Sequence, residues 1–480
     1  MDQEIKDESG DSFSGYLDRF VSFLLDVKPL KRKRTIISFS TADVIASLFF
    51  LFMGMMLRMF RIQYPKTPLY GEHLYGNRIN EYSDGFYSNT MQPAFPYIMT
   101  YFFARLADYK KNINFLVDYR DEKNFEHMIY ITFRITNAFF SALCVPISYI
   151  LLRMLDCAPF TSFLGGIMVL VDPLLIVQGR NCFGHGYAQF FQILSVLFMI
   201  IYSQCGTWLT FIIEGIVFGF SVQTSIFSIG MLLLACFYQI DYEIVMKNRK
   251  IDSQSQFRVF LLLFIAFLTS ILINITHILL CPYFSSTYEK TAESIKSCLV
   301  DKESQNWDIF NSGSSLLYRA IAHMFTSKYD DPLSFKPEFK LNVLKIPFSY
   351  GSLLKYHNSE NRSIICNGNV FVMIPVFCFE IVSLVTCILS KEFFKLDQIF
   401  LYSYIIMLLP CKYLYQYHLP LMLGILNICV CINRASNKKF KGFAQMFMLT
   451  LSVVGFLLWS SWCYGLVQKD DFLYLFNIWK

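Results

Sequence analysis

The chain has 480 residues, of which 55% are hydrophobic, 18% aromatic and only 16% charged, and its mean hydropathy is +0.42. Because a soluble protein carries about a quarter of its residues as charged side chains, this balance excludes a water-soluble globular protein. The net charge of +6 is too small to indicate a nucleic-acid-binding surface over a chain of this length. The apolar residues gather in stretches of about 15 to 25, the length that crosses a bilayer, and predict a polytopic membrane protein.

Residues 1–40 are polar and end in the basic cluster Lys31-Arg32-Lys33-Arg34, directly before the first apolar run. By the positive-inside rule this N-terminal segment is predicted to be cytosolic. It begins with acidic and polar residues instead of a basic start and an apolar core, so no cleaved signal peptide is expected and the first span acts as the targeting signal.

The apolar runs predict about eleven transmembrane helices. They lie at 41–59, 128–152, 158–177, 184–203, 207–221, 224–240, 258–280, 369–390, 397–412, 418–433 and 443–466. The short connections that carry Lys and Arg all fall on the side of the N-terminus, which supports this count.

The predicted topology leaves two large loops on the luminal side, 60–127 and 281–368. They divide the chain into an N-terminal transmembrane region (41–280), the second loop, a C-terminal transmembrane region (369–466) and a luminal tail (467–480). The second loop holds a glycosylation sequon at Asn361, whereas a second sequon at Asn274 falls inside a predicted helix.

Most of the fourteen cysteines lie in or beside apolar runs and are predicted to pack as small hydrophobic side chains. Cys298 and Cys366 both fall in the second luminal loop, where an oxidising compartment permits a disulfide. No CxxC pair is present, and no carboxylate or second histidine lies at ligand spacing from His185 or His418. The sequence therefore predicts no metal site, and these histidines are expected to make polar contacts within the bundle.

A carboxylate with aromatic and apolar neighbours, Glu72, follows the first span. Enzymes that act on lipid-linked substrates need polar groups at the membrane boundary, and such an environment suits a general base. The alternative is a solvated loop residue without a catalytic role. Two charges, Arg134 and Asp172, lie in or at the edge of apolar runs, where an unpaired charge costs several kcal/mol, so each is predicted to bind a substrate or to form an ion pair inside the bundle.

Several motifs in the first half of the chain resemble the eukaryotic protein O-mannosyltransferases. Arg61 with Tyr64-Pro65 resembles the family's R-x-x-x-Y-P element, and the stretch Tyr70-Gly71-Glu72-His73-Leu74-Tyr75-Gly76 resembles its F-D-E-x-H-F-G hallmark. Further matches are Gln92-Pro93 to H-P-P-L-G-K, Tyr130, Arg134 and Ala138 in the second span, Asp172 with Gln178-Gly179-Arg180 to D-N-x-L-x-T-Q-S-R, and Gly215, Gly219 and Ser221-Val222 to G-x-x-x-G-x-S-V-K.

The resemblance continues to about residue 466. The segment Asp331–Pro337 with Lys345 and Tyr350 echoes H-P-Y-S-S-R-P and its downstream Arg and Tyr; Gly368-Asn369 echoes G-N-P and His418-Leu419-Pro420 echoes H-Y-L-P. The order of these motifs in an eleven-span topology identifies the chain as a member of this family. The resemblance implies an all-α polytopic membrane protein of the GT-C glycosyltransferase type.

The activity implied by the resemblance is transfer of mannose from dolichyl-phosphate mannose to Ser or Thr hydroxyls of secretory proteins, in the endoplasmic reticulum membrane. It needs no cofactor beyond this lipid donor and involves no nucleic acid. Glu72 is implied as the acid-base or acceptor-positioning residue, and Arg134 and Arg180 as ligands of the donor phosphate, since a guanidinium binds phosphate oxygens bidentately. Asp84, Asp172 and Lys345 are further candidates. Family members commonly work as hetero- or homodimers of paralogues, so a partner subunit is expected.

The chain departs from the family at four motif positions: Gly71 stands in place of the catalytic Asp, Met91 in place of a His, Gln223 in place of a Lys and His185 in place of an Asp. The family's MIR domain is absent, because loop 281–368 is too short to hold it. Losing a general base costs a factor of about 10²–10⁴ in rate. Two hypotheses follow: Glu72 or Asp84 replaces the missing Asp, or the chain is a catalytically impaired partner subunit of a heterodimer. A transporter is a third class, but the sequence has no inverted repeat to support it.

Overall fold

The computed structural model describes residues 39–65, 68–69, 72–87, 93–111, 115, 131–240, 253–284, 300–301, 317, 321, 343–348, 364, 368–390, 398–411 and 414–466. Outside this part lie the N-terminal segment 1–38, Gly71, Met91, the segment Asp331–Pro337, the sequon at Asn361, both Cys298 and Cys366, and the tail 467–480. Lys345 has a described backbone, in a short 3₁₀ helix, but its side chain is not among the described ones.

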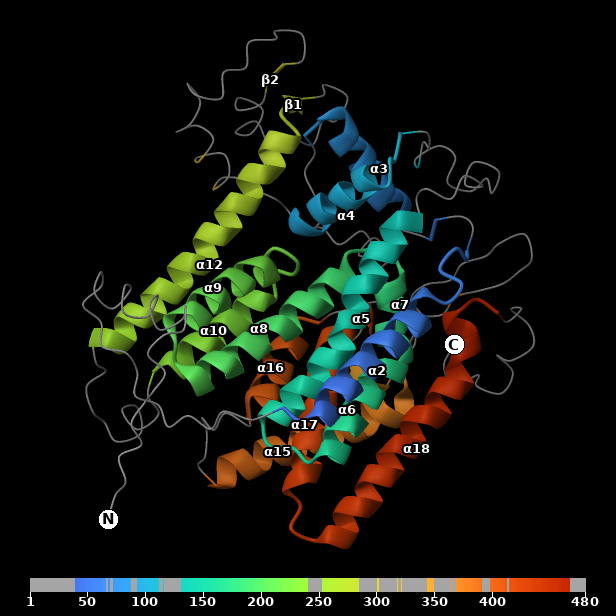
Figure 1. Cartoon of the computed structure of the whole chain (residues 1–480), viewed down its shortest axis with the longest axis vertical. Coiled ribbons are helices and arrows are strands. Elements are labelled where there is room, and N and C mark those ends of the chain that lie inside the picture. Colours follow the sequence, from blue (N-terminus) through green and yellow to red (C-terminus); the bar gives the residue numbers. More distant parts are fainter. Residues whose placement is uncertain are drawn as a thin grey trace.

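The described chain is almost entirely helical, as expected, and its helices pack into one bundle (Figure 1). The elements are α2 (Thr41–Met59), α3 (Glu72–Asp84), α4 (Phe95–Leu106), α5 (Ile131–Met154), α6 (Pro159–Val171), α7 (Pro173–Arg180), α8 (His185–Cys205), α9 (Trp208–Val222), α10 (Ser228–Gln239), α12 (Ser253–Leu280), β1 (Tyr283–Phe284), β2 (Val300–Asp301), η3 (Val343–Phe348), α15 (Val370–Ser390), α16 (Ile399–Leu408), η5 (Leu414–Tyr417), α17 (His418–Arg434) and α18 (Lys438–Cys463).

The apolar helices account for the predicted spans. Six described helices, α2, α5, α8, α12, α15 and α18, are long and apolar enough to cross a membrane, and α6 with α7 forms a seventh candidate that bends by 53° at Asp172. The shorter apolar helices α9, α10, α16 and α17 correspond to the four remaining predicted runs. The two-residue strands β1 and β2 pair in parallel, and an isolated bridge joins Phe86 to Tyr283, so the described residues contain very little strand structure.

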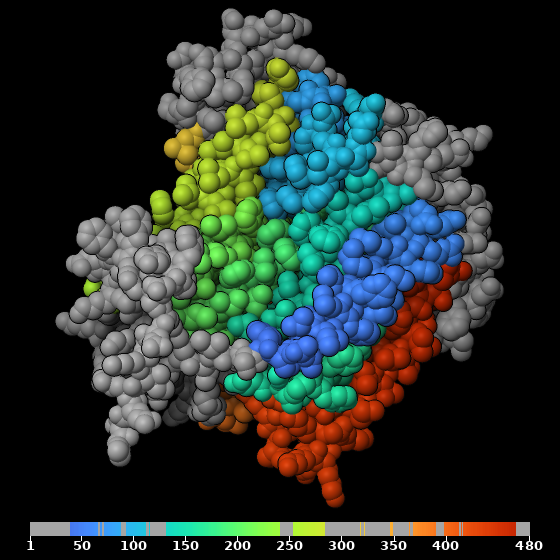
Figure 2. Space-filling view, in the orientation of Figure 1, coloured from blue at the N-terminus to red at the C-terminus, as the bar shows by residue number. Residues whose placement is uncertain are grey.

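Two clusters of apolar side chains hold the bundle together. The larger one runs through the spanning helices, and the smaller one joins α3 and α4 to the ends of α5 and α12. Figure 2 shows α3 and α4 seated between α12 and α5 at one end of the bundle, which we call the α3 end. The polar stretch after the first span therefore folds against the bundle instead of standing free in solvent.

Small residues allow the closest helix contacts. A Cβ added at Gly219 of α9 would lie 2.5 Å from the Cβ of Thr269 and 2.8 Å from the carbonyl oxygen of Ala266, both on α12. At Gly215, one turn earlier, it would lie 2.7 Å from the side chain of Ile265. Glycines four residues apart are a common way for helices to approach closely in membranes, where van der Waals packing drives association.

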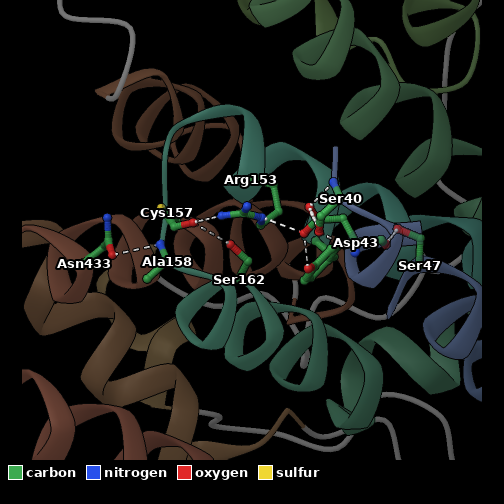
Figure 3. Close-up of polar contacts among 9 residues, drawn as sticks. Ser40, Asp43, Ser47, Arg153, Cys157, Ala158, Ser162 and Asn433 are labelled. Atoms are coloured by element: carbon green, nitrogen blue, oxygen red, sulfur yellow. Dashed lines mark hydrogen bonds and ion pairs between the residues drawn. The ribbon is translucent and has the colours of Figure 1, made fainter. Parts of the chain in front are cut away.

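At the opposite end of the bundle, a buried carboxylate joins the start of α2 to the end of α5 (Figure 3). Asp43 accepts hydrogen bonds from the Tyr149 hydroxyl at 2.6 Å and from Arg153 Nε at 2.8 Å. It also forms a capping box with Ser40, whose backbone N–H it accepts at 2.9 Å. One side chain thus caps α2 and ties it to α5.

Candidate functional site

The centre of the α3 end is a buried ion pair between two of the predicted site residues, Glu72 and Arg134. Arg134 Nη2 lies 2.6 Å from Glu72 Oε2 and its Nε lies 3.0 Å from Oε1, so the pair is bidentate. The side chains are only 3% and 2% exposed. Glu72 is the first residue of α3 and Arg134 lies in the first turn of α5, so the pair links the polar segment after α2 to a spanning helix.

Backbone N–H groups occupy the remaining acceptor positions of the Glu72 carboxylate. Oε2 accepts the N–H of Leu69 at 2.8 Å, and Oε1 accepts the N–H of Cys182 at 2.9 Å. Each oxygen thus accepts two hydrogen bonds, which is the full capacity of a carboxylate. Glu72 is therefore an organising residue of this end of the bundle and is not a solvated loop residue.

Arg134 also holds the segment that follows α2. Its Nη1 donates to the carbonyl oxygens of Pro65 at 2.7 Å and Ile62 at 3.3 Å. A guanidinium carries its donors in a rigid fork, so one buried side chain fixes both the carboxylate and this stretch of backbone.

Arg180, the last residue of α7, lies against the end of α2. It donates to the carbonyl oxygens of Arg58 and Arg61, each at 3.2 Å, and of Phe60, and its guanidinium stacks 4.7 Å from the ring centre of Tyr464. The carbonyls at a helix C-terminus lack intrahelical partners and carry partial negative charge, which a guanidinium neutralises. Arg134 and Arg180 lie close enough for their charges to repel.

The other sequence candidates lie apart from the ion pair. Asp172 caps α7 at the bend after α6, and its Oδ1 accepts the N–H groups of Leu174 at 2.9 Å and Leu175 at 3.1 Å. Asp84 ends α3 and pairs with Lys111 near the surface. The structure therefore brings Glu72, Arg134 and Arg180 to one end of the bundle and gives Asp172 a helix-capping contact.

Sequence reasoning missed a third buried arginine beside these residues, Arg58. It is fully buried in the last turn of α2, where its Nε donates to Ser141 Oγ at 2.8 Å and its Nη2 to the Val169 carbonyl at 3.3 Å. A charge inside an apolar run was the signal that singled out Arg134, and the same signal marks Arg58.

The two histidines singled out for their lack of partners in the sequence contact each other. His185 begins α8 and His418 begins α17, and their ring centres lie 5.0 Å apart in an edge-to-face arrangement. This contact lies within the bundle, but it is a contact between two rings and joins residues distant in sequence. Within the part of the chain that the structure describes, no three His, Cys, Asp or Glu side chains gather as a metal site would require.

Burial sets the charge state of His73, next to Glu72 on α3. The pKa of this imidazole is lowered from its ordinary value because burial disfavours the charged form, and this effect outweighs the attraction of Glu72. His73 is thus neutral at physiological pH, so the cations of the site are its arginines. Three arginines against the carboxylates of Glu72 and Asp172 leave a positive balance, which suits an anionic ligand such as a phosphate.

Comparison with solved structures defines the class of protein. The fold is similar to that of the protein O-mannosyltransferase Pmt1-Pmt2 complex of S. cerevisiae bound to the sugar donor, with a TM-score of 0.73, 12% identity and coverage of 92% of this chain and 95% of that one. It is also similar to the oligosaccharyltransferase of Archaeoglobus fulgidus in the apo form, with a TM-score of 0.51 and 11% identity; 90% of this chain covers 57% of that longer chain. The molecule thus has the fold of the GT-C membrane glycosyltransferases.

The family model of dolichyl-phosphate-mannose-protein mannosyltransferases matches residues 48–287, from α2 to β1. The chain belongs to this family. No curated protein sequence matches it. The matched half contains Glu72, Arg134 and Arg180.

Proposed function

We propose that the chain transfers mannose from dolichyl-phosphate mannose to Ser and Thr hydroxyls of secretory polypeptides. The observation that carries this proposal is the buried Glu72–Arg134 pair, because two segments 62 residues apart, each with a family motif, meet in one charged site. We further propose, from its family, that the protein lies in the endoplasmic reticulum membrane. The distribution of Lys and Arg supports an orientation with a cytosolic N-terminus and the α3 end on the luminal side.

The ion pair suggests how the donor activates the site. A phosphate oxygen of the donor competes with Glu72 for the Arg134 guanidinium, which binds either anion bidentately. When the phosphate takes over these donors, the Glu72 carboxylate is released to accept a proton. Arg180, close to Arg134, adds a second positive charge for the phosphate.

The transfer step forms one bond to the mannose and breaks another. Glu72 takes the proton of the acceptor hydroxyl, the hydroxyl oxygen bonds to C1 of the mannose, and the bond between C1 and the phosphate oxygen breaks. The electron pair leaves with dolichyl phosphate, whose charge the arginines stabilise. Every step uses side chains of the α3 end and no cofactor.

A second candidate function is that of a catalytically impaired subunit in a dimer with a paralogue. The observation that favours it is that all four acceptor positions of Glu72 are occupied, while the family's Asp is replaced by Gly71. In this case the Glu72–Arg134 ion pair only stabilises the fold, and the paralogous subunit supplies the catalytic base.

The deciding experiment measures mannose transfer from dolichyl-phosphate mannose to a Ser/Thr peptide. It uses membranes that contain the chain alone or with its paralogous partner. Glu72→Gln is compared with Glu81→Gln, a matched control on the same helix whose carboxylate pairs with Arg78 at 2.7 Å. Rates are normalised to folded protein, because Glu72→Gln also removes a structural charge.

If the lone chain is active, Glu72→Gln abolishes transfer and Glu81→Gln does not, Glu72 is the base. If transfer is seen only when the chain and its paralogous partner are present together, and Glu72→Gln leaves that rate unchanged, the chain is a supporting subunit. Absence of transfer in both preparations, with folded protein present, contradicts both functions.

A further inference from the structure

One buried carboxamide, that of Asn137, holds both sides of the turn between α7 and α8. Its Nδ2 donates to the carbonyl oxygens of Gln178 at 3.2 Å and Gly179 at 2.9 Å, and also to that of Asn181. Its Oδ1 accepts the N–H of Gly186 at 2.8 Å. The carboxamide thus serves carbonyls at the end of α7 and an N–H at the start of α8, groups that have no partner within their own helices.

Two glycines, Gly184 and Gly186, allow the backbone of the turn to approach Asn137 closely. Gly186 lies so close to α5 that an added Cβ would be 2.1 Å from the carbonyl oxygen of Asn137. Gly184, which precedes α8, has a φ of 75°, a left-handed conformation that glycine adopts without steric cost. Because Asn137 is 1% exposed, these hydrogen bonds are protected from competition with water.

The turn reaches the ion pair through a single amide. Cys182, the second residue of the turn (181–184), donates its N–H to Glu72 Oε1 at 2.9 Å. Asn137 lies three residues after Arg134 on α5 and is thus one helical turn from the other half of the pair. A path of hydrogen bonds therefore runs from Asn137 through the turn to the Glu72 carboxylate.

We propose that Asn137 is a positioning residue for Glu72, which acts by fixing the turn 181–184 and thereby the Cys182 amide. Its effect on mannose transfer rests on the proposed function, since it requires a catalytic Glu72. Its effect on the turn and on the ion pair does not, so the two ideas are tested separately.

The first test asks whether Asn137 holds the turn, with the full chain purified in lipid nanodiscs. Cys182 is 4% exposed, so its modification by a maleimide reports opening of the turn and is followed by mass spectrometry. Asn137→Ala removes the carboxamide and Gly186→Ala pushes α8 from α5; both are expected to speed Cys182 labelling about tenfold. The matched control Asn427→Ala removes a buried amide that binds Glu380 at 2.9 Å on α15, and leaves labelling unchanged.

The second test asks whether the turn positions Glu72. The melting midpoints of Asn137→Ala, Glu72→Gln and the double variant form a double-mutant cycle, which needs no activity. A non-additive result is expected, because the Cys182 amide and the carboxylate share one hydrogen bond; the cycle of Asn427→Ala with Glu72→Gln is additive. In an active preparation Asn137→Ala lowers transfer about tenfold, whereas the control Asn427→Ala leaves it unchanged.

The outcomes separate the proposal from the function on which it builds. Wild-type labelling of Cys182 in both Asn137→Ala and Gly186→Ala, or an additive cycle with Glu72→Gln, overturns the positioning role. If the wild-type chain transfers no mannose while labelling and coupling behave as expected, the proposed function fails and the connection from Asn137 to Glu72 stands.

Discussion

The Glu72–Arg134 pair predicts a large loss of stability when only one partner is changed. In Glu72→Gln one carboxylate oxygen becomes an amide nitrogen, and either oxygen so replaced faces two N–H donors: Arg134 Nη2 and Leu69 N at Oε2, or Arg134 Nε and Cys182 N at Oε1. The arginine charge stays buried without its counterion. Breaking a buried pair in this way costs about 3–5 kcal/mol.

The control on the same helix sets the scale. Glu81 pairs with Arg78 three residues earlier, where the Arg78 side chain is 19% exposed. The Glu81 side chain is only 7% exposed and also accepts a hydrogen bond from Asn77 Nδ2 at 2.9 Å, so it contributes more than an exposed pair of this spacing. Because water can still solvate Arg78, Glu81→Gln is expected to cost about 1–2 kcal/mol, less than Glu72→Gln.

The assay is thermal unfolding of the purified chain in lipid nanodiscs, followed by intrinsic fluorescence. Glu72→Gln is expected to lower the melting midpoint by about 3–5 °C, and Glu81→Gln by less than about 2 °C. The double variant Glu72→Gln/Arg134→Met removes both charges and recovers part of the loss, since no charge is left unpaired. If Glu72→Gln has the same melting midpoint as the wild type, the conclusion that the Glu72–Arg134 pair stabilises the α3 end is refuted.

Three further predictions concern packing, capping and pH. Gly219→Ala forces α9 away from α12 and is expected to cost about 1–3 kcal/mol. In the control Gly442→Ala, the added Cβ meets nothing within 4 Å, and the helix gains about 0.5–1 kcal/mol in stability. Equal melting midpoints for the two variants contradict the close contact between α9 and α12. Asp43→Ala loses the capping contact of α2 and the contact with Arg153, and is expected to cost about 2–4 kcal/mol. An unchanged melting midpoint means that the contact of Asp43 with α5 does not stabilise the fold. Because burial lowers the pKa of His73 below 6.5, the unfolded chain takes up this proton first, and stability falls as the pH drops below 6.5. His73→Gln removes this contribution, so its midpoint changes less between pH 7 and 5. Identical pH profiles for His73→Gln and the wild type argue against a lowered pKa for His73.

Much of the architecture follows from local sequence. The apolar runs predict the spanning helices because a chain in a bilayer satisfies its backbone hydrogen bonds within each helix, so length and hydropathy suffice. The predicted span 158–177 is broken into α6 and α7, and this break also has a local cause. Asp172 supplies the N-cap of α7 and Pro173 its first helical residue.

The sequence singled out Glu72, Arg134 and Arg180 as candidate site residues but did not predict that Glu72 and Arg134 pair. Arg134 stood out because a charge in an apolar run must find a partner or a polar cavity. The same reasoning does not identify its partner, because Glu72 lies outside the apolar runs, in the loop that follows the first span. Helix periodicity relates residues three or four positions apart and gives no information about residues 62 positions apart.

The sequence by itself determined the class of protein: a helical membrane bundle with the motifs of the mannosyltransferase family. These properties depend on composition, on the length of apolar runs and on short motifs, all of which are local. Only the tertiary structure decided which charges meet. It placed Glu72 against Arg134, His185 against His418, and the Asn137 carboxamide at the turn that touches Glu72. The physical reason is that burying a charge or an amide is favourable only when its partners arrive from several helices at once.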